Sequence, residues 1–579
     1  MLTKSIQLNR TSITSLTKRY QSTLSSSTTP QFGHFSLPPI RNEPVYSYSE
    51  NTVEYNKLQS AIQKLKSEAV DIPIIINGKE IRDGKKGKQV MPSNHSHTVA
   101  TFTESTSQHT HDAINCALHA KTQWESLSIQ QRSAIFLKAA DLLSHKYRYE
   151  SNAACILGQG KNMYQAEIDS AAEQCDFWRY NVKFANDIYN VQPPDNSDTT
   201  WNRLEYRSLE GFILAITPFN FTAIGSNLAS APVLMGNVSL WKPSSTALLS
   251  NYVAMKIMRE AGVPDGVINF LPSTSGVDIS TACFAHSEFA GLHFTGSTNV
   301  FKSLWSSISD NLTHYRSYPR IVGETGGKNF HFVHESADPQ LVIHQTIRGA
   351  FEYAGQKCSA TSRAYMPKSL WHTIKDGLIT ETNKIISTHF GQPDCRSTFV
   401  SAVIDDKAYK RLSTALDKIK SDSELTILAG GKCDNTTGYF IEPTIVQTSN
   451  PKNWLMKNEL FGPIICIYVY DESNELNKAL ELCDTTAEYG LTGAIFARDR
   501  YAIEHMNNKL IHSAGNFYIN DKSTGAIVGQ QPFGGARGSG TNDKAGSHLN
   551  LLRWVSARTI KETSVPITHW SYPYMNVKQ

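Results

Sequence analysis

Phe212-Ile213-Leu214-Ala215-Ile216 is a short apolar run that ends at the turn Pro218-Phe219-Asn220-Phe221, and it predicts a buried strand. Similar runs follow at residues 238–241, 267–271 and 291–295. After the first of these, residues 246–262 have a helical pattern that ends at a glycine. Strands that alternate with helices pair in parallel, so this stretch predicts a Rossmann-like sheet. Ligands bind such a sheet beyond the carboxyl ends of its strands.

The same alternation extends in both directions from this stretch. Downstream, we expect strands at 329–333, 362–366, 425–429 and 464–470, and helices at 341–354, 370–388, 408–420 and 472–484. Upstream, the apolar run 72–81 surrounds Asn77-Gly78, which is a hairpin signal, and residues 107–192 have long helical patterns. The expected fold class is therefore α/β, with a Rossmann-like domain followed by a second α/β domain.

Two segments are expected to serve assembly. Residues 200–210 are polar and alternating, which suits an edge hairpin that reaches a partner subunit. Residues 554–579 are rich in aromatic side chains and are expected to pack along that partner. The expected assembly is a homodimer or a higher homo-oligomer.

The composition argues against several classes of function. The 579 residues are 40% hydrophobic and 19% charged, which is typical of a globular protein. The net charge of +4 is small for this length and does not indicate a nucleic-acid-binding protein. The nine cysteines are scattered without a C-x-x-C pair, so neither a disulfide framework nor a metal site is indicated. The uncharged run 211–241 is interrupted by prolines and asparagines, so we expect no membrane span.

The N-terminus has a different composition from the rest of the chain. Residues 1–30 are rich in hydroxyl side chains and contain no acid, and their basic residues are Lys4, Arg10, Lys18 and Arg19. This composition is typical of a mitochondrial transit peptide, although a disordered basic tail would share it. Residues 31–69 are expected to form a linker or N-terminal extension.

Two motifs carry candidate chemistry. Cys358 stands in Gly355-Gln356-Lys357-Cys358-Ser359, among small and basic residues that favour an accessible thiolate. On composition alone, any one cysteine is more often a small buried hydrophobe. Upstream, Val322-Gly323-Glu324-Thr325-Gly326 places a carboxylate among apolar and glycine residues. Cys358 and Glu324 are therefore a candidate nucleophile and a candidate general base.

The chain resembles the aldehyde dehydrogenase superfamily over residues 70–565. Besides these two motifs, the resemblance rests on the Pro-Phe-Asn-Phe turn, on Trp241-Lys242-Pro243-Ser244, on Phe294-Thr295-Gly296-Ser297 and on Glu459-Leu460-Phe461-Gly462-Pro463. Residues 529–544 resemble one branch, the delta-1-pyrroline-5-carboxylate (glutamate semialdehyde) dehydrogenases of proline breakdown. The implied fold is a Rossmann-like NAD-binding domain, an α/β catalytic domain and a small β element for oligomerisation.

The resemblance implies these domain boundaries. Residues 70–327 bind NAD and include the oligomerisation hairpin near 198–212. Residues 328–515 form the catalytic domain. Residues 516–579 hold the substrate-anchor loop and a C-terminal oligomerisation segment.

The resemblance also implies a reaction. Cys358 attacks the aldehyde of L-glutamate 5-semialdehyde, Asn220 and the Cys358 N–H stabilise the oxyanion, and Glu324 activates the water that releases L-glutamate. The expected location of this reaction is the mitochondrial matrix. Three alternatives stay open: another semialdehyde dehydrogenase, a relative that transfers the acyl group to CoA, and a catalytically silent binding protein. Glu324 disfavours transfer to CoA, because activated water would destroy the thioester first.

NAD is the implied cofactor, and no metal is expected. The implied NAD-binding residues are Lys242, Ser245, Thr295, Gly296, Ser297, Glu459 and Phe461. The strand that ends at Thr295 leads into a helix whose first N–H groups can receive the pyrophosphate. Many members of the superfamily have a glycine at the position of Phe301. The phenylalanine agrees instead with the resembled branch. Ser245 has no charge that would repel a 2′-phosphate, so NADP stays open.

The implied substrate-binding residues are Ser359, Gly525, Ala526, Phe221, Phe533 and Glu173. Ser359 and the loop around Gly525 hold the substrate carboxylate, since exposed N–H groups of small residues form an anion nest. Phe221 and Phe533 wall the aliphatic chain, although ordinary core aromatics would look the same in sequence. Glu173 approaches the amino group. The other carboxylates of residues 165–173 are expected on a solvated helix face.

Overall fold

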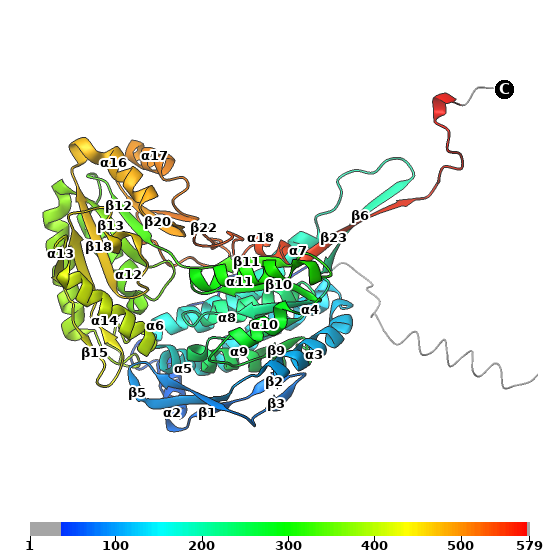
Figure 1. Ribbon diagram of the computed structural model, residues 1–579, viewed down its shortest axis with the longest axis horizontal. Coiled ribbons are helices and arrows are strands. Elements are labelled where there is room, and N and C mark those ends of the chain that lie inside the picture. Colours follow the sequence, from blue (N-terminus) through cyan, green and yellow to red (C-terminus); the bar gives the residue numbers. More distant parts are fainter. Residues whose placement is uncertain (1–35, 576–579) are drawn as a thin grey trace, which may run out of the picture. The chain divides into compact units, whose positions relative to one another are not determined.

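The stretch around residue 212 forms part of a seven-stranded sheet (Figure 1). The computed structural model describes residues 36–575, so the predicted transit peptide lies outside the described residues. The strand order is β11-β10-β7-β8-β9-β2-β3. Their bounds are β2 (Ile74–Ile76), β3 (Lys79–Ile81), β7 (Phe212–Ile216), β8 (Ser239–Lys242), β9 (Ile268–Phe270), β10 (Phe289–Thr295) and β11 (Arg320–Glu324). The predicted parallel pairing of β7, β8, β9 and β10 and the predicted hairpin of β2 and β3 are both confirmed. β11, which was not predicted, also pairs in parallel with β10.

The strand order of this sheet reverses beside β7. β8 lies on one side of β7, whereas β10 lies on the other. Ligands bind open α/β sheets at such a reversal, beyond the carboxyl ends of the strands. Asn220 follows β7, Gly296 follows β10, and β11 ends at Glu324. The topology therefore brings these predicted site residues to one edge of the sheet.

Helices cover both faces of the first sheet. α3 (Ser107–Glu125) and α10 (Val277–Phe284) lie on one face, with α11 (Thr298–Asp310) next to α10. α8 (Thr222–Leu234) lies on the other face, beside α4 (Ile129–Leu142), α7 (Gln174–Tyr189) and α9 (Leu248–Ala261). α9 ends as predicted at Gly262, whose φ of 114° suits a residue without a Cβ.

The N-terminal part adds helices and a small sheet. α2 (Val53–Ser67) packs on α5 (Arg148–Gln159), and β1 (Val70–Ile72), β5 (Asn94–Thr103) and β4 (Lys86–Met91) form a three-stranded sheet. Between α6 (Met163–Ala166) and α7, residues 167–173 form a π-helix. No helix within residues 36–575 is long and apolar enough to cross a membrane.

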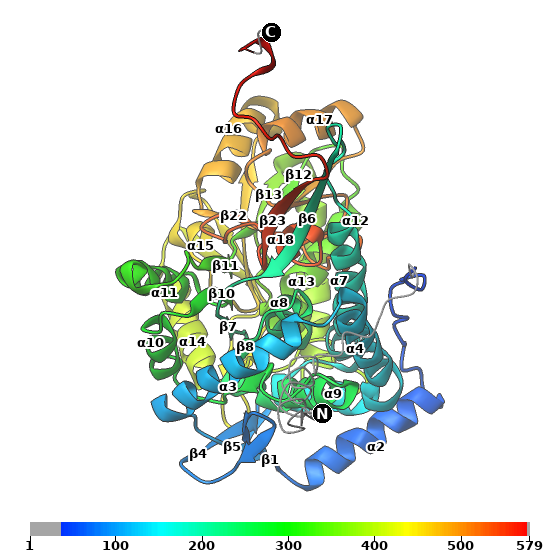
Figure 2. The ribbon, with the colours of Figure 1, turned by 90° about the vertical axis from the view of Figure 1, so that its right-hand side faces the viewer.

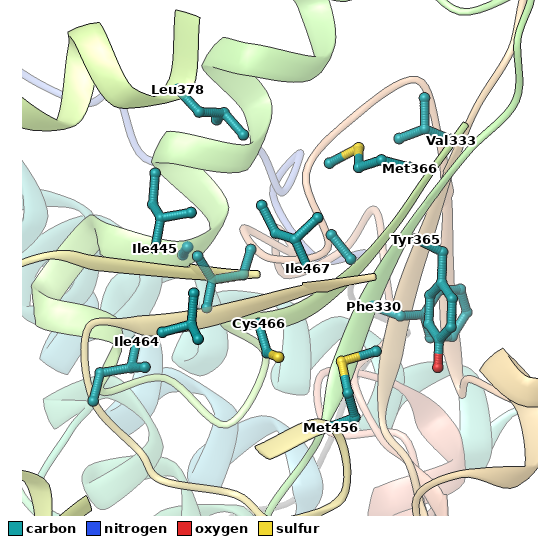
Figure 3. Close-up of a cluster of buried hydrophobic side chains, with 14 of the residues drawn as sticks. Phe330, Val333, Tyr365, Met366, Leu378, Ile445, Met456, Ile464, Cys466 and Ile467 are labelled. Atoms are coloured by element: carbon teal, nitrogen blue, oxygen red, sulfur yellow. The ribbon is translucent and has the colours of Figure 1, made fainter. Parts of the chain in front are cut away.

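A second seven-stranded sheet has the order β14-β17-β18-β13-β12-β20-β21. Its strands are β12 (Asn329–Val333), β13 (Thr361–Pro367), β14 (Leu425–Ala429), β17 (Thr444–Thr448), β18 (Ile464–Tyr470), β20 (Thr492–Phe496) and β21 (Asn516–Ile519). α12 (Pro339–Phe351) packs with α13 (Lys368–Thr388) against the sheet, which α16 (Glu472–Thr485) and α17 (Arg500–Lys509) also cover. Leu378 of α13 meets Ile445 and Ile467 of the sheet in a buried apolar core (Figure 3).

β6 (Thr200–Ser208) pairs along its whole length with β23 (Val555–Thr563) in an antiparallel ribbon. Figures 1 and 2 show the two strands side by side. The predicted hairpin near 198–212 is therefore wrong, because the partner strand comes from the C-terminal segment. Beyond β23 the aromatic and aliphatic side chains Val565, Ile567, Trp570, Tyr572 and Tyr574 are exposed.

Candidate active site

A cavity of about 490 Å³ is lined by the carboxyl ends of β10 and β11, the Cys358 loop and residues 522–531, here called the anchor loop. It brings together nine predicted site residues: Cys358, Glu324, Thr295, Ser359, Gly525, Ala526, Phe221, Phe533 and Glu173. The other predicted residues, Asn220, Lys242, Ser245, Gly296, Ser297, Glu459 and Phe461, are not part of its lining. Chain segments far apart in sequence thus meet around one thiol.

A strained turn precedes Cys358. The predicted helix 341–354 is too long, because α12 ends at Phe351 and Tyr353 and Ala354 adopt left-handed φ angles of 54° and 51°. Gly355 follows at φ 64°, and a Cβ there would lie 2.3 Å from the carbonyl oxygen of Gly462, so a larger residue cannot fit. Left-handed non-glycine residues are costly and occur preferentially at functional sites.

The thiol of Cys358 is buried, with 6% of the residue exposed. Burial raises the pKa of this thiol and the nearby Glu324 raises it further, whereas the N–H groups of Ser359 and Cys358 itself lower it. The basic neighbour Lys357 pairs with Glu352 at 2.8 Å. Desolvation therefore outweighs these donors and raises the pKa of the thiol, which is the opposite of the direction that its basic neighbours in sequence favour. Cys358 still lines the cavity, where a substrate can reach it.

Glu324 lies at the carboxyl end of β11 and lines the same cavity. Burial raises the pKa of its carboxyl well above the ordinary range, although Lys544 acts in the opposite direction. Lys544 donates instead to the carbonyl oxygens of Gly515 and Gly534, at 2.7 and 2.9 Å. A carboxyl group with a raised pKa can accept a proton near neutral pH, as a general base requires.

Asn220 is buried in the turn after β7, beside the chain that leads to Cys358. Its Nδ2 donates to the carbonyl oxygen of Gln356 at 3.1 Å, which fixes the amide two residues before the thiol. An amide NH₂ carries two hydrogens, so a second donor remains. Although Asn220 does not line the cavity, its contact is with the Cys358 loop itself.

Hydroxyl groups join Ser359 to the anchor loop. Ser359 Oγ and Thr524 Oγ1 lie 2.7 Å apart, and Ser523 donates to the Ser359 carbonyl oxygen at 3.0 Å. Gly525 has a φ of 100°, which few other residues tolerate. The loop is therefore held next to Cys358 with its small residues facing the cavity.

Glu173 ends the π-helix and faces the cavity. Burial raises the pKa of its carboxyl to about 8, the Asp169 carboxylate adds to this, and Lys161 opposes it. The expectation that the neighbouring acids form a solvated face is wrong: Glu167 and Asp169 are fully buried. The π-helix turns these acids inward, where each has a basic partner, Arg148 for Glu167 and Lys161 for Asp169.

The predicted cofactor residues lie along the carboxyl edge of the first sheet. Lys242 ends β8, and burial lowers the pKa of its ammonium group to about 8. Ser297 is the N-cap of α11. These residues offer an ammonium group, a hydroxyl group and a helix N-terminus, a donor set that suits a pyrophosphate and a ribose.

Glu459 lies against the motif that contains Glu324. Glu459 accepts a hydrogen bond from the Gly327 N–H at 2.9 Å, and a Cβ on Gly326 would come within 2.1 Å of its carboxylate. Burial raises the pKa of Glu459 to about 7. Phe461 packs edge-on against Phe219, with ring centroids 5.8 Å apart. Gly326 therefore leaves room for the Glu459 carboxylate, and Gly327 binds that carboxylate through its N–H group.

The family model described as "Aldehyde dehydrogenase family" matches residues 81–560. This chain belongs to the aldehyde dehydrogenase family. It is 52% identical over 546 residues to the mitochondrial delta-1-pyrroline-5-carboxylate dehydrogenase of Dictyostelium discoideum, covering 94% of this chain and 97% of that protein. The human protein of the same name is 48% identical over 543 residues, covering 94% and 95%.

Solved structures of the family give the same fold. The delta-pyrroline-5-carboxylate dehydrogenase of Mycobacterium tuberculosis, bound with NAD, superposes with a TM-score of 0.90 at 43% identity, covering 94% of this chain and 100% of that one. The predicted aldehyde dehydrogenase fold is thereby confirmed.

Several residues at this aldehyde dehydrogenase site escaped the sequence prediction. Arg348, Lys357 and Lys522 add positive charge to the cavity wall. Asp169 accepts hydrogen bonds from the Thr222 and Ala223 N–H groups at the start of α8, at 3.0 and 2.9 Å. Lys357 could have been found from its place beside the thiol, whereas no sequence signal places Asp169 at the start of α8.

Proposed function

We propose that this chain oxidises L-glutamate 5-semialdehyde, the open form of 1-pyrroline-5-carboxylate, to L-glutamate with NAD. The observation that carries the proposal is the single cavity that joins Cys358 to the anchor loop on one side and Glu173 on another. A substrate with an aldehyde, a carboxylate and an ammonium group would use all three features. The names of the similar proteins and the NAD in the Mycobacterium tuberculosis structure support it.

In the proposed reaction the thiol proton of Cys358 passes to water in the cavity, and the sulfur adds to the aldehyde carbon, which forms the oxyanion of a thiohemiacetal. The second hydrogen of the Asn220 amide and the Cys358 N–H donate to its oxyanion, where one donor contributes about 2.7–4 kcal/mol. NAD, when bound, supplies the hydride acceptor. Oxidation leaves a thioester on Cys358.

Glu324 then takes a proton from water, and the hydroxide oxygen attacks the thioester carbon. The carbon–sulfur bond breaks, the proton held by Glu324 passes to the sulfur, and L-glutamate and the Cys358 thiol are released. Burial keeps Glu324 neutral at low pH, so its base form is more populated as the pH rises.

For the cofactor, Lys242 and Ser245 would hold the adenosine-side ribose, and Thr295, Gly296 and Ser297 would receive the pyrophosphate at α11. Glu459 and Phe461 would hold the nicotinamide-side ribose. The neutral Ser245 leaves room for NADP as a weaker alternative.

The anchor loop would bind the substrate carboxylate through the N–H groups of Gly525 and Ala526 and the hydroxyl of Ser359. Phe221 and Phe533 would wall the aliphatic chain. The Lys161 ammonium lies 4.0 Å from the centroid of the Phe221 ring and pairs with Asp169 at 2.7 Å. This cation–π contact therefore helps to fix the position of the Phe221 ring. Glu173 would accept the substrate ammonium.

Glu173→Gln should raise the KM for 1-pyrroline-5-carboxylate about tenfold, the loss expected for one hydrogen bond to a charged group. Because burial raises the pKa of Glu173 to about 8, the wild-type KM should fall as the pH rises through that value and the carboxylate forms. The variant should lack this change, and its kinetics with propanal should match the wild type. An unchanged KM at every pH would remove Glu173 from the substrate site.

We also propose a location and an assembly for the enzyme. The basic, acid-free residues 1–30 and the mitochondrial names of similar proteins support import into the mitochondrial matrix. The ribbon of β6 and β23 and the exposed aromatic tail support a homodimer or a higher homo-oligomer. The proposed domains are an NAD-binding domain of residues 70–327, a catalytic domain of residues 328–515 that carries the nucleophile, and a C-terminal part of residues 516–579. This last part supplies the anchor loop and a contact between subunits.

Steady-state NADH formation with 1-pyrroline-5-carboxylate, succinate semialdehyde and propanal tests the proposed substrate. We expect the first to have the highest kcat/KM by at least about a hundredfold over propanal, since propanal lacks both charged groups. Equal values for all three would keep the dehydrogenase chemistry and refute the carboxylate site. No NADH from any of them would leave an NADP-dependent enzyme, a relative that transfers the acyl group to CoA, and the silent protein as the alternatives.

A further inference from the structure

Residues 42–48, here called the strap, precede α2 and lie against the π-helix and α7. Tyr48 donates to Glu167 Oε2 at 2.7 Å, and the Tyr46 N–H donates to Glu167 Oε1 at 2.9 Å. Glu43 pairs with Arg148 and Arg179. Buried ion pairs and hydrogen bonds of this kind fix the strap to the body of the protein.

One strap residue, Asn42, uses every hydrogen-bonding position of its side chain. Its Nδ2 donates to Asp176 Oδ2 at 2.7 Å and to the Val528 carbonyl oxygen at 2.8 Å. Its Oδ1 accepts from Gln530 Nε2 at 3.1 Å and from the Tyr180 hydroxyl at 3.3 Å. Because a carboxylate and a carbonyl oxygen can only accept, these partners fix the orientation of the amide.

These four bonds join three separate parts of the chain. Asn42 belongs to the strap, Asp176 and Tyr180 to α7, and Val528 and Gln530 to the anchor loop. The Tyr180 ring also packs on the loop, since a Cβ on Gly529 would lie 2.4 Å from Tyr180 Cε1. Asn42 itself lines the cavity that contains Cys358.

We propose that Asn42 is a positioning residue for substrate specificity, which holds the anchor loop in the conformation that binds the substrate carboxylate. Its bond to Val528 lies two residues from Ala526, whose N–H is assigned to that carboxylate. The inference rests on the proposed function for its substrate. The strap therefore forms part of the wall of the substrate site.

The decisive variant is Asn42→Ala, assayed as the full-length folded enzyme. We expect the KM for 1-pyrroline-5-carboxylate to rise about tenfold, because the Val528 carbonyl loses its donor and the loop is no longer fixed. The kcat should change less than about twofold, and the kinetics with propanal should stay as in the wild type. Asn42→Asp keeps the shape of the side chain but cannot donate to Val528, so it should raise the KM at least as much.

Tyr48→Phe is the matched control. It removes a strap hydrogen bond of similar length, but Tyr48 lies outside the cavity lining. We expect a lower melting temperature with an unchanged KM. A rise in KM equal to that of Asn42→Ala would overturn the inference, because it would show that any weakening of the strap has the same effect.

Hydrogen exchange of the free enzyme, read by mass spectrometry over residues 522–531, tests loop positioning without a substrate. Asn42→Ala should speed exchange in this segment, and Tyr48→Phe should not. An unchanged exchange rate or an unchanged KM in Asn42→Ala overturns the inference. If the wild type does not prefer 1-pyrroline-5-carboxylate but exchange does speed up, the proposed substrate fails and the positioning role stands.

Discussion

Replacing Cys358 by alanine should abolish NADH formation, with a loss in kcat of at least about 10⁴-fold, because the reaction then has no nucleophile to form the thiohemiacetal. The cavity places the thiol with Glu324 and the anchor loop, and no other cysteine of residues 36–575 lines it. The rate is measured from NADH absorbance with saturating 1-pyrroline-5-carboxylate and NAD.

Cys283→Ala is the matched control for this prediction. Cys283 is a buried free cysteine in α10 and does not line the cavity, so its variant should keep near-wild-type activity. Circular dichroism should show that both variants are folded. Substantial NADH formation by Cys358→Ala would show that another group is the nucleophile.

Replacing Glu324 by glutamine should separate the two halves of the reaction. We expect a rapid burst of NADH of about one equivalent per active site, followed by turnover slowed about 10²–10⁴-fold, because the thioester forms but water is not activated. Stopped-flow absorbance measures both phases.

The pH dependence gives the same prediction an independent check. Burial raises the pKa of Glu324, and the base form is the deprotonated one, so the wild-type steady-state rate should increase with pH through that raised pKa. The increase should lie above the ordinary glutamate pKa of about 4.3, and Glu324→Gln should lose it. An equal slowing of burst and turnover would mean that Glu324 acts on the Cys358 thiol instead.

Local patterns were sufficient to predict most of the two sheets. The strands β7, β12, β14 and β18 coincide with their predicted runs, because each is a short, largely apolar segment next to glycine or proline residues. The nine cavity residues were also predicted in advance, since short motifs specify them. Their meeting in one cavity depends on the strand order, which these motifs imply only through the resemblance.

The features that were not predicted depend on contacts between distant segments. β6 is a recognisable strand, but its partner β23 lies near the other end of the chain. The acids of the π-helix have the pattern of a surface face, and only Arg148 and Lys161 reveal that they are buried. The basic residues around Cys358 suggest a thiolate, yet Lys357 turns to Glu352. Asn42 stands in a stretch without any motif.

The most direct test of the account is the intact mass of the Glu324→Gln enzyme after mixing with NAD and 1-pyrroline-5-carboxylate. We predict an added mass equal to glutamate less one water, located by peptide mapping on Cys358. This adduct would establish the nucleophile, the substrate and the thioester together. A burst of NADH with no adduct, or an adduct on any other residue, would contradict the account.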